Sequence, residues 1–184
     1  MHRDDLQLTT ARLLLRPLRL EDFDAWADLM ADEEATRFLG GRQARSVAWR
    51  GFLCSAGSWC MTGIAMFAVI ERTSGRWIGR VGPWRPEGWP GPEVGWAIAR
   101  PFWGHGYATE AATASIGWAF ATLGWGEIIH CISPDNVLSQ SVARKLGSRY
   151  RGPGRLPPPF GEAEVDIWGQ SREDWVAAQP RSRL

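Results

Sequence analysis

The residues with the clearest chemical potential are two closely spaced glycines ahead of an alanine-rich segment. They lie in the run Trp103-Gly104-His105-Gly106-Tyr107-Ala108-Thr109-Glu110-Ala111. Glycine lets the backbone approach a ligand closely, and the unpaired amides at a helix N-terminus attract an anion with the help of the helix dipole. The run therefore predicts a phosphate-binding turn that opens a helix. By itself it fits a plain tight turn equally well, because it has neither the third glycine of the dinucleotide fingerprint nor the Gly-Lys-Ser/Thr of a P-loop.

A second segment strengthens the first. It reads Asn136-x-x-Ser139-x-x-Val142-Ala-Arg-Lys-Leu146-Gly147 and follows the next apolar strand-like run. Asparagine is a favoured N-cap, so this segment predicts another strand-to-helix connection. The two connections together are far more specific than either one alone.

Strands that could position these connections are predicted from short apolar runs rich in β-branched and aromatic residues. Two stretches rich in proline and glycine, 82–92 and 152–161, are predicted as a loop and as the separator of the last two strands. The predicted strands span 12–18, 66–71, 76–81, 93–99 and 127–133, with further candidates at 149–151 and 165–169.

Helices are predicted where apolar residues recur at spacings of three and four. The helix that opens at Asn136 carries Leu138, Val142 and Leu146 at this spacing. The other predicted helices span 21–30, 47–61 and 108–123, and the chain is expected to finish in a short, polar, mobile end.

Composition restricts the class of protein. The chain has 184 residues, 45% hydrophobic and 22% charged, which predicts one domain over 1–184 with its core between residues 9 and 171. Lysine and arginine number 21 against 20 acidic residues, so no general attraction to nucleic acid or to an anionic membrane is expected. No signal peptide and no apolar stretch of about 20 residues is present. These features predict a cytoplasmic protein.

The three cysteines, Cys54, Cys60 and Cys131, are an odd number without the spacing of metal ligands. They predict neither a disulfide framework nor a zinc site, and no metal is expected. We interpret them as small buried apolar residues.

The two connections, together with TARLLLRPL near the start of the chain, resemble the GCN5-related N-acetyltransferases (GNAT), in particular the RimJ/RimL-like ribosomal-protein branch. The resemblance covers about residues 9–171. It implies an α+β fold with a mostly antiparallel sheet of about six or seven strands and about four flanking helices. The sheet would be splayed between its fourth and fifth strands, with acetyl-CoA in the opening.

The resemblance also implies the residues that hold acetyl-CoA. The backbone of Trp96, Ala97 and Ile98 would bond to pantetheine, and Asn136 and Ser139 would line its thioester end. Trp103 stands where the family often has Gln or Arg, although aromatic residues are frequent there in this branch; packing against the phosphoadenosine end is its alternative role. The pyrophosphate would be held by the amides of Gly104, His105, Gly106, Tyr107, Ala108 and Thr109.

Acetyl transfer to an amine needs a deprotonated amine, a stabilised oxyanion and a proton for the leaving thiolate. In the family picture, backbone amides at 96–98 stabilise the oxyanion and Glu93 is the candidate base, directly or through water. The alternative for Glu93 is a solvated carboxylate at the end of a loop. Ser139 is the candidate donor to the thiolate, or else only a helix-start hydroxyl. The tyrosine that many relatives use as the acid is replaced by Ala143.

The two central histidines have simpler interpretations. His130 alternates with apolar neighbours along a strand and is interpreted as a hydrogen-bonded core residue, and His105 as a solvent-facing neighbour of the phosphates. The predicted function is an acetyl-CoA-dependent N-acetyltransferase. It would transfer the acetyl group to a primary amine, either a protein N-terminus or a small molecule, by direct attack in a ternary complex. A homodimer is a further expectation. The alternative is a non-catalytic acyl-CoA-binding sensor, which the missing tyrosine makes credible.

Overall fold

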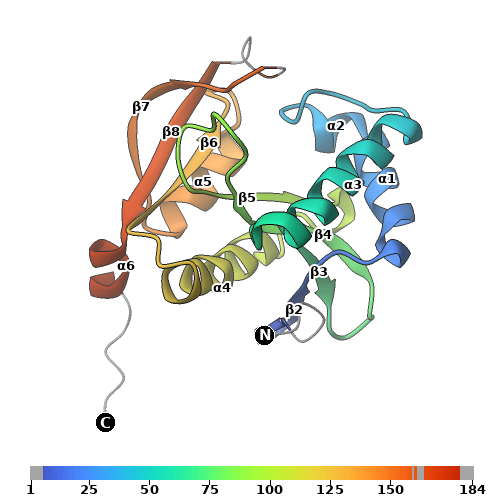
Figure 1. The fold of residues 1–184 in the computed structure, drawn as a ribbon, viewed down its shortest axis with the longest axis horizontal. Helices are drawn as coiled ribbons and strands as arrows, with labels where there is room; N and C mark the ends of the chain where they lie inside the picture. The colour runs from blue at the N-terminus through green and yellow to red at the C-terminus, as the bar shows by residue number, and fades with distance from the viewer. Residues whose placement is uncertain (1–5, 159, 161–163, 179–184) are drawn as a thin grey trace.

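The computed structural model describes residues 6–158, 160 and 164–178. The chain forms one eight-stranded sheet in the order β1-β2-β3-β4-β5-β6-β8-β7 (Figure 1). All neighbouring strands are antiparallel except β5 and β6, which are parallel. The strands are β1 Leu8–Thr9, β2 Leu13–Arg16, β3 Phe67–Glu71, β4 Trp77–Trp84, β5 Glu93–Ile98, β6 Glu127–Ile132, β7 Arg149–Arg155 and β8 Glu164–Ser171.

Helices cover both faces of the sheet. One face packs on α4, which buries Ile116 against Leu13 and Val81, and α5 lies on the same side. The other face packs on α1 and α3, where Trp26 and Phe52 meet Ala97. Among the described residues the α-helices are α1 Phe23–Ala31, α2 Glu33–Thr36, α3 Arg45–Thr62, α4 Tyr107–Thr122, α5 Val137–Lys145 and α6 Arg172–Ala178.

The sheet opens between β5 and β6. In the described part of the chain the two strands pair only at Glu93 and Ile129, and the Ile129 amide donates to the Pro92 carbonyl at 2.9 Å. Figure 1 shows β6, β7 and β8 on one side of the molecule and β2, β3 and β4 on the other, with β5 between them. The predicted mixed fold is confirmed, and the opening lies between the strands predicted at 93–99 and 127–133.

Two stretches predicted as irregular are in fact strand. β4 continues through Gly82–Trp84, because its ladder with β3 ends at Val81 and Pro83 therefore costs no hydrogen bond on that side. β7 likewise continues through Gly152 to Arg155, paired with β8. The expected separator 152–161 is correspondingly shorter, and residues 159 and 161 lie outside the described residues.

The remaining differences concern short elements and exposure. β1, α2 and α6 were not predicted; α6 begins where a polar, mobile end was expected, and residues 179–184 lie outside the described chain. Cys54 and Cys60 are exposed, so their interpretation as buried residues is wrong, and only Cys131 is partly buried. Leu138 is also exposed, because it lies in the first turn of α5. None of the described helices is both long and apolar enough to cross a membrane.

Candidate active site

The glycine turn connects β5 to α4. Gly104 and Gly106 have φ values of 78° and 79°, which lie in the left-handed region where a side chain is strained. Both glycines and His105 between them are exposed, and α4 begins directly afterwards at Tyr107. The first-turn amides of a helix have no acceptor within the helix. The predicted turn at a helix start is confirmed, and its amides can receive an anion.

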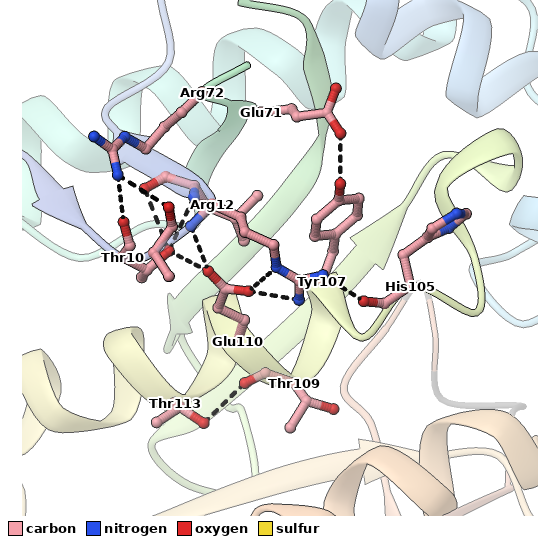
Figure 2. A network of polar contacts seen from close by, with 11 residues as sticks. Thr10, Arg12, Glu71, Arg72, His105, Tyr107, Thr109, Glu110 and Thr113 are labelled. Carbon is pink, nitrogen blue, oxygen red and sulfur yellow. Dashed lines mark hydrogen bonds and ion pairs between the residues drawn. The ribbon is translucent and has the colours of Figure 1, made fainter. Parts of the chain in front are cut away.

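Arg12 fixes this turn from the neighbouring β2 side (Figure 2). Its guanidinium donates to the His105 carbonyl at 2.9 Å and to Glu110 Oε2 at 2.6 Å. Glu110 Oε1 accepts from the Thr10 hydroxyl at 2.6 Å and from the Arg12 amide at 2.9 Å. Burial tends to raise the pKa of Glu110, but these hydrogen bonds and the guanidinium charge lower it overall. Arg12 therefore holds the turn in place, and Glu110 neutralises the charge of Arg12.

Tyr107 is anchored in a similar way. Its hydroxyl donates to Glu71 Oε1 at 2.5 Å, and the Arg12 guanidinium lies 4.6 Å from its ring centroid (Figure 2). Glu71 also accepts from the Ser74 hydroxyl at 2.6 Å. The sequence reasoning missed Arg12, Glu71 and Glu110, because their partners come from three distant segments. The one available signal for a link to the turn was the segment TARLLLRPL, which contains Arg12 and contributes to the family resemblance.

Two carbonyls on the edge of β5 that faces the opening are occupied by side chains. Successive residues of a strand direct their backbone groups to opposite sides. The Val94 carbonyl accepts from His130 at 2.6 Å, and the Ile98 carbonyl accepts from the Trp103 indole at 2.6 Å. By the same alternation, the backbone groups of Trp96 face the opening, whereas Ala97 faces β4 opposite Arg80. Trp96 is therefore the residue of this edge with both backbone groups available.

The Trp96 side chain reaches across the opening to α5. Its indole donates to Ser139 Oγ at 3.1 Å, and the Ser139 amide donates to Asn136 Oδ1 at 3.1 Å. Asn136 is thus the N-cap of α5, as predicted. The side chain of Ala143, at the position of the tyrosine acid in many relatives, is fully buried beside Ile132 and Trp168.

Replacing Asn136 with alanine removes this cap. We expect the free energy of unfolding to fall by about 1 kcal/mol, because the Ser139 amide loses its acceptor. Urea denaturation of the variant and of Asn136→Asp, which keeps an acceptor oxygen, measures the difference. Equal losses in both variants would contradict a capping role.

Glu93 is buried, with 7% of its surface exposed, so the alternative of a solvated carboxylate is wrong. Its Oε2 accepts from the Trp89 indole at 2.5 Å and its Oε1 from the Cys131 amide at 3.1 Å. Burial raises the pKa of Glu93 to about 7, against the lowering effect of these hydrogen bonds and of the Arg80 charge. A carboxylate with a pKa near neutrality can exchange a proton with an amine at physiological pH.

His130 joins the two strands beside the opening. A carbonyl can only accept, so Nδ1 carries the hydrogen donated to Val94, and Nε2 then accepts from the Ser148 hydroxyl at 2.9 Å. The Gln170 side chain donates to the same hydroxyl at 3.0 Å. Burial lowers the pKa of His130 to about 4, so the ring is neutral. Its interpretation as a hydrogen-bonded core residue is confirmed, as is the exposure of His105.

Comparison with known proteins places this arrangement in context. The model of the family described as "Acetyltransferase (GNAT) domain" matches residues 12–149. YkkB of Bacillus subtilis, an uncharacterized protein, is 33% identical over 48% of this chain, and the match spans about half (52%) of that relative's length. YnaD of the same organism, an uncharacterized N-acetyltransferase, is 26% identical over 80% of this chain and 85% of its own.

Solved structures show the same fold. An acetyltransferase from Agrobacterium tumefaciens is 28% identical, with a TM-score of 0.81 over 94% of this chain and 98% of its own. RimJ of Mycobacterium smegmatis, solved in complex with CoA-disulfide, is 18% identical, with a TM-score of 0.67 over 88% of this chain and 83% of its own. At that identity, the likeness to RimJ extends to the fold alone.

Proposed function

Since the chain belongs to the GNAT acetyltransferase family, we propose that it is an N-acetyltransferase that moves the acetyl group of acetyl-CoA to a primary amine. The observation that carries the proposal is the exposed glycine turn at the start of α4, which follows the end of β5 that no longer pairs with β6. A helix N-terminus suits the pyrophosphate, and the free strand edge suits an extended amide-containing chain such as pantetheine.

The residues around the opening fit acetyl-CoA in three places. The amides from Gly104 to Thr109 would hold the pyrophosphate, and the backbone of Trp96 would pair with pantetheine. Asn136 and Ser139 would line the thioester end. Trp103 would support this site from within, because its indole is committed to the Ile98 carbonyl. Acetyl-CoA would supply the acetyl group in activated form, as a thioester.

The acceptor amine would approach from the face of the sheet that carries α1 and α3. Residues 93, 95 and 97 of β5 alternate with Trp96, and Ala97 packs in the cluster formed by those helices. Glu93 shares this face and would take a proton from the amine, directly or through water. A backbone amide at 96–98 would stabilise the oxyanion, and the Ser139 hydroxyl would donate to the departing sulfur.

Release of CoA is the direct test. Purified protein is mixed with acetyl-CoA and a panel of small amines and peptide N-termini, and the thermal shift caused by acetyl-CoA alone is measured in parallel. We expect a stabilising shift and amine-dependent release of free CoA. A shift without turnover on any amine would favour the acyl-CoA sensor, and the absence of both would reject both functions.

A further inference from the structure

The face of the sheet under α1 and α3 holds buried donors that lack acceptors. Among the described residues, the indole nitrogens of Trp26 and Trp77 and the Nε atom of Arg80 are buried without a hydrogen-bond partner. Trp26 and Trp77 belong to the cluster that covers this face. Buried donors are nearly always paired in folded proteins, and an unpaired one is costly. A group of such donors on one face therefore suggests a missing acceptor.

Arg80 is the strongest of these donors. It lies on β4 opposite Ala97, and its guanidinium carbon lies 4.5 Å from the Trp26 ring centroid. It is absent from the ion pairs within 4.0 Å that join described residues. Burial lowers the pKa of Arg80 only to about 10, so the group keeps its charge at neutral pH. The side chain of Arg80 is partly exposed, but its Nε atom is buried without a partner, and a partly desolvated cation with no ion pair attracts an anion.

Arg80 and Glu93 face the same region. Arg80 stands opposite Ala97, and Glu93 alternates onto the same face of β5. The charge of each shifts the pKa of the other, yet none of the ion pairs within 4.0 Å among the described residues joins them. The face thus presents a proton acceptor and an unpaired cation close together. A ligand that satisfies both must carry an amine near an anionic group.

Resting on the proposed function, we infer that the acceptor is a small amino acid or a derivative that keeps its carboxylate, with Arg80 binding the carboxylate and Glu93 facing the amine. The planar guanidinium fork matches the geometry of a carboxylate. A peptide N-terminus lacks this group, since its first carboxyl is an amide. Of the two acceptor classes, the small molecule therefore fits this face and the peptide N-terminus does not.

The test compares matched acceptors. Initial rates of CoA release are measured with the common amino acids and with the corresponding amino acid amides, which keep the amine and lose the charge. We expect kcat/KM to be about 100-fold higher for the best carboxylates, because a site built around a charged group rejects the analogue without it. Arg80→Met should reduce this preference to a few-fold, and Arg80→Lys should restore part of it.

Two controls keep the test independent of folding. Arg76→Met removes an exposed arginine from the turn before β4 and should leave the preference unchanged. Acetyl-CoA should stabilise Arg80→Met as much as the wild type. A loss of that stabilisation, or amides used as well as amino acids, would overturn the inference while the N-acetyltransferase function stands.

A second measurement does not depend on turnover. In protein labelled with 15N-arginine, the Nε–H signal of Arg80 is assigned from its absence in Arg80→Met. Addition of acetate or glycine should shift this signal, and acetamide should not. A shift without CoA release on any acceptor would keep the carboxylate site and reject the proposed function. No shift with either carboxylate would overturn the inference.

Discussion

Replacing Glu93 with glutamine is expected to lower kcat by about 10²–10⁴-fold, the usual contribution of a positioned general base. Glutamine has nearly the same shape and can still accept from the Cys131 amide, but it cannot take a proton from the amine. Steady-state CoA release with the best acceptor measures the effect. Trp89→Phe is a matched control, because it removes the indole donor and leaves the carboxylate in place.

The pH dependence separates a base from a structural carboxylate. Because the pKa of Glu93 is raised to about 7, kcat/KM of the wild type should rise through neutral pH as the carboxylate ionises. Glu93→Gln should lack this rise. A rise that persists unchanged in the variant would remove Glu93 from the mechanism.

The free energy of unfolding should depend on pH in a different way from activity. The folded pKa of Glu93 lies above its ordinary value, so its contribution to folding is fully present below pH 4.5 and is lost as the pH rises through about 7. Glutamine is neutral at every pH. Above neutral pH, Glu93→Gln should therefore be no less stable than the wild type in urea denaturation, which separates its loss of activity from unfolding.

Introducing an acidic residue at Thr109 should weaken acetyl-CoA binding strongly. Thr109 lies in the first turn of α4, directly after the glycine turn. For an assumed separation of about 5 Å between such an aspartate and a bound pyrophosphate, repulsion at an effective dielectric constant near 20 would be about 3 kcal/mol for each phosphate charge. We expect KM for acetyl-CoA to rise by about 100-fold or more. The helix itself should be slightly stabilised, because acidic residues favour helix N-termini.

Two variants isolate the charge from its position. Thr109→Asn has a similar shape without the charge and should change KM only a few-fold. Thr113→Asp adds the same charge at an exposed position one turn further along α4 and should also have a small effect. If Thr109→Asn were as damaging as Thr109→Asp, the anion would not bind at this turn.

Local patterns predicted the elements that carry the site. Gly104 and Gly106 need a left-handed backbone, and Asn136 favours a cap, so both helix starts could be predicted from adjacent residues. The splay between β5 and β6 came from the family resemblance, because the place where a ladder ends depends on pairing between distant segments.

Burial and pairing could not be predicted in the same way. The burial of Glu93 depends on Trp89 and Cys131, which approach it from a loop and from β6. Arg80 lacks an ion pair because none of the described carboxylates comes within 4.0 Å of it, which no local pattern reveals. A proline normally argues against a strand, so the sequence did not predict Pro83 as part of β4. The ladder between β3 and β4 ends at Val81, so the missing N–H of Pro83 leaves no gap in it.

The occupied edge of β5 has a consequence for self-association. An unpaired strand edge usually invites another polypeptide to add a strand, which leads to aggregation. Here His130 occupies the Val94 carbonyl and Trp103 the Ile98 carbonyl, so of the three residues between them only Trp96 directs its backbone groups to the opening. An incoming protein strand cannot form a ladder over so short a stretch. The opening beside β5 can therefore admit a slender ligand without recruiting a strand from a second molecule.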